Sequence, residues 1–206
     1  MISILNRLLM FSLCLFLLYG CAINRVSIPI DSNSVQPGTS VTMSGQSLKL
    51  LGKPIAVGDS LPSVDLVDAM TMTPVDLSKM KGSILLLSIV PSVDTVVCET
   101  QTHYLGEEGS KLPPDIRLIA VSRDTPFAQK RFAKEAKLDN IQFLSDYKEG
   151  AFGRATGLYI DGLALLARSV IVVDKEGKVR YIQVVPEITH LPNMEQAFQR
   201  AGELAK

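Results

Sequence analysis

A nearly unbroken apolar run over residues 84–90 limits the fold of this chain more than any other feature of its sequence. Only Ser88 interrupts the run, and a continuous apolar segment of this length is typical of a buried strand. The residues from Thr95 onward predict a loop that turns into a helix over residues 98–105. The chain therefore contains a buried strand that leads through a loop into a helix.

Cys98 stands where this predicted helix begins. A sulfur in the first turn of a helix faces backbone N–H groups without a helical partner and the positive end of the helix dipole. Both favour the thiolate over the thiol, and the thiolate is the reactive form. The segment thus predicts one activated sulfur at the end of a buried strand.

The remaining pattern predicts one α/β domain over residues 41–206. The expected strands are residues 41–43, 48–51, 64–68, 84–90, 116–121, 143–144, 169–173 and 179–185, and the expected helices are residues 98–105, 126–136, 150–155 and 192–204. Parallel β-α units followed by an antiparallel pair and a terminal helix predict a thioredoxin-like fold. It would have a central mixed sheet flanked by helices and an added N-terminal β-hairpin.

The helix predicted over residues 126–136 has a clear start signal. Thr125 is a favoured N-cap residue, and proline follows it at the first helical position. We expect Phe127, Phe132 and Ala136 to point from this helix toward the core.

Residues 1–20 are typical of a secretory signal peptide. The apolar segment over residues 8–19 follows Arg7, and it is shorter than the roughly 20 residues that a membrane-spanning helix needs. It ends in Leu-Tyr-Gly-Cys at residues 18–21, which resembles the lipobox of bacterial lipoproteins, although the tyrosine is bulkier than usual at its place. An uncleaved membrane anchor and an ordinary signal peptide are the alternatives.

The lipobox resemblance implies that Cys21 is lipidated on its sulfur and becomes the new N-terminus. The exported protein would then be anchored to a bacterial membrane, facing the periplasm or the cell exterior. Ala22 in place of Asp favours the outer membrane by the usual lipoprotein sorting pattern. Residues 21–40 are rich in Ser, Asn, Pro and Gly, which predicts a flexible tether between the lipid and the domain.

Cys98 is the only one of three cysteines that this processing leaves free. Cys14 lies in the predicted signal peptide, and Cys21 carries the predicted lipid. No internal disulfide is then available, although export leads to an oxidising compartment. A lone cysteine in an exported protein is either buried and inert or reactive, and the helix start favours the second.

Composition and spacing exclude several other functions. The chain has 21 basic and 21 acidic residues, no Trp and only 6% aromatic residues, so we expect no nucleic-acid partner. His103 and His190 share no metal-ligand spacing with cysteines or carboxylates. Gly150, Gly153 and Gly157 do not lie between a strand and a helix, as a nucleotide loop requires. We therefore expect neither a metal nor another cofactor.

Residues 91–98, with the sequence PSVDTVVC, form a specific motif. The spacing Pro91-x-x-x-Thr95-x-x-Cys98 resembles the active-site signature of the peroxiredoxin family. The longer pattern Pro-Ser-Val-Asp-Thr-x-x-Cys over the same residues is similar to that of the thiol peroxidase subfamily.

Two further segments are similar to thiol peroxidases. Residues 121–132 (VSRDTPFAQKRF) and 166–174 (LARSVIVVD) recur in the family's order and separation, so the resemblance covers about residues 41–206. In the second segment, Arg168 aligns with the family's active-site arginine. Thiol peroxidases usually carry a resolving cysteine where this chain has Ala133. The resemblance therefore implies a one-cysteine variant that cannot form the usual internal disulfide.

This resemblance implies a thiol-dependent peroxidase. The Cys98 thiolate would attack a peroxide oxygen, leaving a sulfenic acid and releasing water or an alcohol. Arg168 would hold the thiolate and polarise the peroxide with its N–H donors. Thr95 would share its hydroxyl between sulfur and peroxide, or cap the helix, and these roles are compatible. Pro91 would cover the pocket and limit the access of water.

The sequence leaves the substrate and the reductant open. The sulfenic acid needs an external thiol, either a small one or one on a thioredoxin-like partner. The peroxide is hydrogen peroxide or an organic or lipid hydroperoxide. The family resemblance also implies a homodimer, although no interface is recognisable in the sequence.

Two other functions could use the same fold. A membrane-tethered thiol–disulfide oxidoreductase would need a Cys-x-x-Cys motif, and Thr95 occupies the place of its first cysteine. A non-catalytic binding lipoprotein is favoured by the absence of a sulfur at Ala133. The joint presence of the four active-site residues opposes it.

Overall fold

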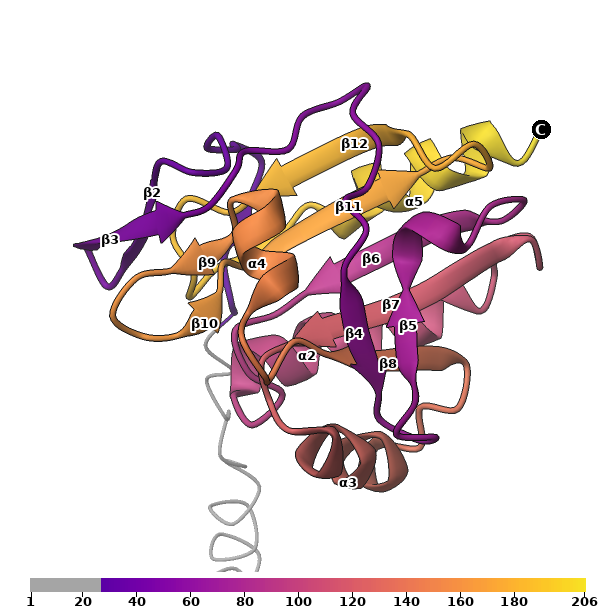
Figure 1. The fold of residues 1–206 in the computed structure, drawn as a ribbon, viewed down its shortest axis with the longest axis horizontal. Helices are drawn as coiled ribbons and strands as arrows, with labels where there is room; N and C mark the ends of the chain where they lie inside the picture. The colour runs from indigo at the N-terminus through magenta and orange to yellow at the C-terminus, as the bar shows by residue number, and fades with distance from the viewer. Residues whose placement is uncertain (1–26) are drawn as a thin grey trace, which may run out of the picture.

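A seven-stranded mixed sheet forms the centre of the described structure, a computed structural model that covers residues 27–206 (Figure 1). From one edge to the other, its strands are β12 (Val179–Val184), β11 (Ser169–Val173), β6 (Ile84–Ile89), β7 (Ile116–Ser122), β8 (Ile141–Ser145), β4 (Asp65–Asp68) and β5 (Pro74–Asp76). The three strands β6, β7 and β8 run parallel. All other pairings in this sheet are antiparallel.

Helices join the parallel strands and cover both faces of the sheet. They are α2 (Val96–Gly109), α3 (Pro126–Ala136), α4 (Ala151–Thr156) and α5 (Met194–Leu204), with the short 3-10 helix η1 (Leu77–Lys79). Parallel neighbours need a crossover connection, and α2 and α3 supply it between β6, β7 and β8. Helices α2, α3 and α5 pack on one face, whereas α4 lies on the other (Figure 1). The thioredoxin-like α/β fold that the sequence predicts is confirmed.

Strand β6 contributes to the cores on both faces of the sheet. All six of its residues are buried, as the apolar run predicts. Successive side chains point to opposite faces, so Leu86 packs with residues of α2, α3 and α5, while Leu85 and Leu87 pack in the other core. Ser88 is a buried polar residue on the same side as Leu86.

The predicted N-terminal hairpin is also confirmed, and it belongs to a second sheet. This four-stranded sheet has the order β10 (Leu165–Leu166), β9 (Tyr159–Ile160), β3 (Gln46–Leu51) and β2 (Ser40–Met43). The turn between β2 and β3 consists of Ser44 and Gly45, both with positive φ. A two-residue turn of that kind fits the twist of a hairpin.

The prediction for Phe127 is wrong. Its side chain is 72% exposed, whereas Gln129, Phe132 and Ala133 are buried beneath α3. A separation of five residues turns a helix by roughly 140° beyond one full turn, so Phe127 cannot share a face with Phe132. The buried side of α3 instead contains Gln129, which precedes Phe132 by three residues and Ala133 by four.

The predicted flexible tether is wrong for the part that the structure describes, residues 27–40. Strand β1 (Ile30–Asp31) pairs in parallel with β13 (Leu191–Pro192), and the amide of Val35 donates to the carbonyl of Val184 at 3.0 Å. The Gln183 side chain donates to two further carbonyls of this segment. On the side of residues 27–40, these contacts use backbone amides and carbonyls, which every type of residue provides. The polar composition of the segment therefore did not reveal that it is attached to the domain.

The predicted signal peptide and Cys21 lie outside the described residues. Within residues 27–206, no helix combines the length and the apolar character that crossing a bilayer would require.

Glu187 fastens the N-terminal hairpin to the loop that follows β12. Its carboxylate accepts hydrogen bonds from the Thr42 hydroxyl at 2.9 Å, from the amides of Ser44 and Gly45 at 3.0 and 3.2 Å, and from the Thr189 hydroxyl at 2.8 Å. Burial alone would raise the pKa of Glu187, but these hydrogen bonds lower it to about 2.

We predict that Glu187→Gln lowers the free energy of unfolding by about 1–2 kcal/mol at pH 7, because charge-assisted hydrogen bonds are lost. A carboxylate whose pKa falls on folding adds stability above its unfolded pKa and loses it as pH falls through the folded one. The difference between the two proteins should therefore shrink between about pH 4.5 and about pH 2. Urea unfolding across this range measures it. The exposed Glu135→Gln serves as control, and a pH-independent difference would contradict the prediction.

Candidate active site

Two neighbouring strands of the central sheet, β6 and β11, bring the predicted site residues together at one end of the strands. Strand β6 ends at Ile89, just ahead of the loop that leads into α2. Strand β11 runs antiparallel to β6, and its first residue, Ser169, lies opposite Ile89. Arg168 directly precedes β11, so it lies beside the end of β6, from which the loop leads to α2 and Cys98.

Cys98 is the third residue of α2, which begins one residue after Thr95. Its side chain has 0% exposure and is the free cysteine of the described residues. The Nη2 group of Arg168 donates a hydrogen bond to Cys98 Sγ at 3.3 Å. The predicted pairing of Cys98 with Arg168 at a helix N-terminus is therefore present.

The guanidinium of Arg168 is held from all of its sides. Its Nε donates to the carbonyl of Ile188 at 2.8 Å, and its Nη1 donates to Gln101 Oε1 at 2.7 Å. The amide of Gln101 is fixed in turn, because its Nε2 donates to Ser88 Oγ at 2.8 Å. These bonds orient the guanidinium so that its third nitrogen, Nη2, donates to the sulfur.

Charge balance makes the sulfur the natural partner of this arginine. Arg168 is 2% exposed, and neither the carbonyl nor the amide oxygen that it contacts carries a charge. Burial lowers the pKa of Arg168, while the charge of Cys98 and the hydrogen bond to it act in the opposite direction. A buried cation needs a nearby negative charge, and a Cys98 thiolate supplies one. The arrangement therefore stabilises the ionised, nucleophilic form of the sulfur.

The other two predicted residues lie in the loop before α2. Pro91 is buried, and its role in limiting the access of water stays a prediction. Thr95 is exposed, and its hydroxyl donates to the carbonyl of Ser92 at 3.4 Å. It makes no hydrogen bond to Cys98 and none that caps the helix. The role of Thr95 toward sulfur and peroxide thus stays a prediction.

Sequence reasoning missed Gln101 and Ser88, although both left a signal. Gln101 follows Cys98 by three residues, which places the two on the same side of a helix. Ser88 is the single polar residue in the apolar run, and both side chains are fully buried. A polar side chain in a buried strand needs a hydrogen-bond partner, so Ser88 alone predicts a second buried polar residue nearby.

The helix that carries Ala133 belongs to the same core as Cys98. Ala133 is buried, and no sulfur is present there. The ring of His103 packs edge-on against Phe132, and His190 lies 3.1 Å from an oxygen of Asp31. Among residues 27–206, no group of three or more His, Cys, Asp or Glu side chains is placed to hold a metal ion.

Comparisons with known proteins agree with this geometry. Residues 56–198 match the family described as Redoxin. The chain is 39% identical over 166 residues to the thiol peroxidase of Bacillus subtilis, which covers 81% of this chain and 98% of that protein. It is 40% identical over 162 residues to the thiol peroxidase of Halalkalibacterium halodurans, covering 79% and 96%. The crystal structure of a peroxiredoxin-like protein from Aquifex aeolicus is similar with a TM-score of 0.76 and 33% identity, covering 84% of this chain and 99% of that one.

Proposed function

The chain belongs to the redoxin family as a thiol peroxidase, and from this premise we propose that it reduces hydroperoxides with Cys98 as the only sulfur that reacts. The observation that carries the proposal is the buried Arg168 guanidinium, whose Nη2 donates to the sulfur and whose other partners are uncharged. Such a pair prepares a nucleophile and a fixed cation at one point, as two-electron reduction of a peroxide requires.

The first half-reaction oxidises Cys98. The thiolate attacks the terminal oxygen of a hydroperoxide, an S–O bond forms, and the O–O bond breaks. Sulfur loses two electrons and becomes a sulfenic acid, while the departing alkoxide or hydroxide takes up a proton and leaves as alcohol or water. Negative charge moves from sulfur to the leaving oxygen in this step, and the Arg168 guanidinium is already in place to stabilise it.

The second half-reaction needs two external thiols. One thiolate attacks the sulfenic sulfur, forming a mixed disulfide and releasing the hydroxyl as water. A second thiol then attacks this disulfide, releases the Cys98 thiolate and leaves as part of an external disulfide. Ala133 supports this route, because the position of the usual resolving cysteine carries no sulfur. A small thiol and a thioredoxin-like protein are the two classes of reductant.

Cys98 is fully buried, so the chain around it, including the loop over residues 91–95 that leads into α2, has to move before a thiol as large as a protein reaches the sulfur. A small peroxide needs a much smaller opening. The two half-reactions therefore place different demands on this loop.

We predict that residues 27–206, when mixed with hydrogen peroxide and a dimedone-type probe, form a sulfenic adduct on Cys98 within seconds. The adduct should be absent in Cys98→Ser, and its formation should slow about 100-fold in Arg168→Met, as for a lost oxyanion-hole donor. Mass spectrometry detects the adduct. The domain is a suitable sample, because the similar thiol peroxidases consist of this domain over nearly their whole length.

Turnover with a panel of thiols then identifies the reductant class, and hydrogen, alkyl and phospholipid hydroperoxides identify the substrate. Absence of an adduct at micromolar peroxide would contradict the proposed activity. Adduct formation without turnover on any thiol would contradict the one-cysteine cycle.

The location of the protein is a second part of the proposal. The lipobox-like sequence at residues 18–21 supports export, lipidation of Cys21 and attachment to the outer membrane. Ile30 is the first described residue in a β pairing with the domain, so only eight residues lie between it and Cys21, and this stretch of chain reaches at most roughly 30 Å. The domain would then stay close to the membrane surface. A homodimer rests on the family resemblance alone.

We predict that a bacterial host expressing the full chain incorporates labelled palmitate into it and retains it in the membrane fraction. Cys21→Ala should abolish both the label and the retention, while Cys14→Ala should change neither. A full chain that is unlabelled and released with the soluble fraction would contradict the lipoprotein proposal without affecting the proposed chemistry.

A further inference from the structure

Asp124 binds the loop that precedes Cys98. It lies in the turn between β7 and α3, and its carboxylate accepts hydrogen bonds from Ser92 Oγ at 2.7 Å and from the amide of Val93 at 2.8 Å. It also accepts one from Ser122 Oγ at 2.6 Å. A single carboxylate therefore joins the end of β7 to the loop between β6 and α2.

The anchor itself is rigid. Ser122 is the last residue of β7, and its hydroxyl also accepts a hydrogen bond from Gln129 Nε2 of α3 at 2.8 Å. The carbonyl of Asp124 accepts from the hydroxyl of Ser145, the last residue of β8. Two strands and a helix thus fix Asp124, and the remaining partner of its carboxylate is the loop.

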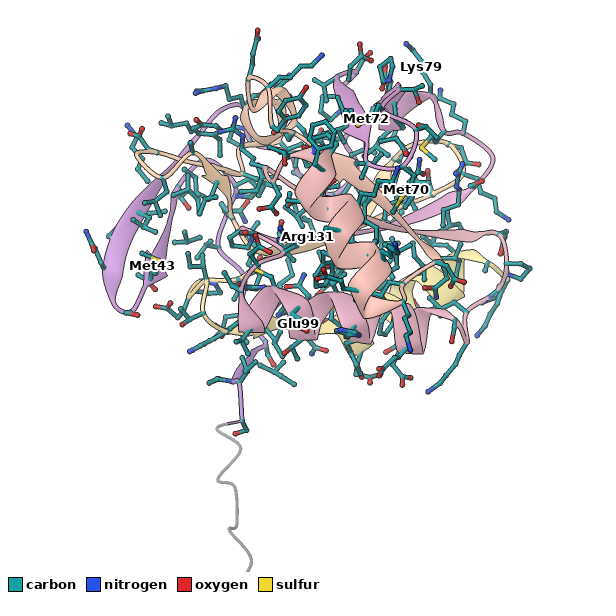
Figure 2. All side chains as sticks on the ribbon, turned by 90° about the horizontal axis from the view of Figure 1, so that it is seen from below. Met43, Met70, Met72, Lys79, Glu99 and Arg131 are labelled. Atoms are coloured by element: carbon teal, nitrogen blue, oxygen red, sulfur yellow. The ribbon has the colours of Figure 1, made fainter. Side chains whose placement is uncertain are left out.

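Among the described residues, the loop has one other side-chain tie to a neighbouring element, and Val90, just ahead of it, donates its amide to the carbonyl of Val121 at 3.0 Å. Arg131 of α3 lies 2.9 Å from Asp94, and both side chains are 58% exposed. Figure 2 shows Arg131 on α3 where this helix lies next to the start of α2, which Glu99 marks. An exposed ion pair of this kind contributes little, because solvent screens it. Asp124 is therefore the stronger of the two ties.

We propose that Asp124 is a positioning residue that holds the loop over residues 91–95 closed beside Cys98. The proposal rests on the proposed peroxidase function and adds a division of labour to it. With the loop closed, the first turn of α2 and Arg168 hold the sulfur in the arrangement that peroxide reduction needs. With the loop released, a large thiol reaches the sulfur. Asp124 accordingly favours the first half-reaction and restrains access in the second.

This role predicts two effects of opposite sign in Asp124→Ala, measured on residues 27–206. Oxidation of Cys98 by hydrogen peroxide should slow about 10- to 100-fold, because the reacting groups are no longer held in place. Alkylation of reduced Cys98 by a bulky polyethylene-glycol maleimide should accelerate at least about 10-fold, because the sulfur is uncovered more often. The rate of amide hydrogen exchange at residues 92–98 should rise together with the maleimide rate. Asp124→Asn keeps one acceptor oxygen, so its peroxide and maleimide rates should lie between those of the wild type and of Asp124→Ala.

Asp76→Ala provides the matched control. Asp76 accepts hydrogen bonds from Ser63 Oγ at 2.6 Å and from the amide and hydroxyl of Ser78 at 2.9 and 2.7 Å, but it lies on β5, at the far edge of the sheet. We expect it to lose comparable stability in urea while leaving the peroxide rate, the maleimide rate and loop exchange within about twofold. Ser92→Ala removes one bond from the loop side and replaces Asp124→Ala if that protein fails to fold.

Three outcomes would overturn the positioning role. They are unchanged rates in Asp124→Ala, peroxide and maleimide rates that change in the same direction, and equal effects of Asp124→Ala and Asp76→Ala. If the wild-type domain forms no sulfenic acid at all, the proposed function fails. Maleimide access and hydrogen exchange then still test whether Asp124 holds the loop.

Discussion

The contact between the Arg168 guanidinium and the Cys98 sulfur is the interaction on which the rest of this structure depends. An arginine that is almost fully buried beside neutral oxygens lacks a counter-charge unless the sulfur is ionised. The thiolate in turn would be costly to bury without the cation. Each group thus makes the charge of the other tolerable, and the 3.3 Å contact is the centre of the site. The polar residues around it serve to keep the arginine in that one orientation.

The fold supports this pair from two sides. On one side, the loop after β12 presents the Ile188 carbonyl to Arg168, and the same residue's amide donates to Thr42 of the N-terminal hairpin. Glu187 strengthens that junction, so the added hairpin has a direct link to the active site. On the other side, Asp124 binds the loop that precedes Cys98. The N-terminal hairpin and the turn that carries Asp124 therefore both support the contact between Arg168 and Cys98.

Much of this arrangement was predictable, and the remainder has a common physical cause. The apolar run predicted β6, and the sequence around Cys98 predicted a cysteine at the start of a helix, because both signals lie within short stretches of sequence. The exposure of Phe127 was mispredicted because one apolar residue does not establish which side of a helix is buried. The attachment of residues 30–38 and the bond between Gln101 and Ser88 depend on contacts between distant segments. Such contacts leave no local pattern beyond an isolated polar residue.

The rate at which iodoacetamide alkylates Cys98, compared between the wild-type domain and Arg168→Met at pH 7 and at pH 10, tests the central pairing most directly. The thiolate is the species that reacts, so the wild-type rate should exceed that of the variant at least about 10-fold at pH 7. The ratio of the two rates should shrink at pH 10, because alkali favours the thiolate without the help of the cation. Equal rates at pH 7, or a ratio that stays the same at pH 10, would show that Arg168 does not keep the sulfur charged.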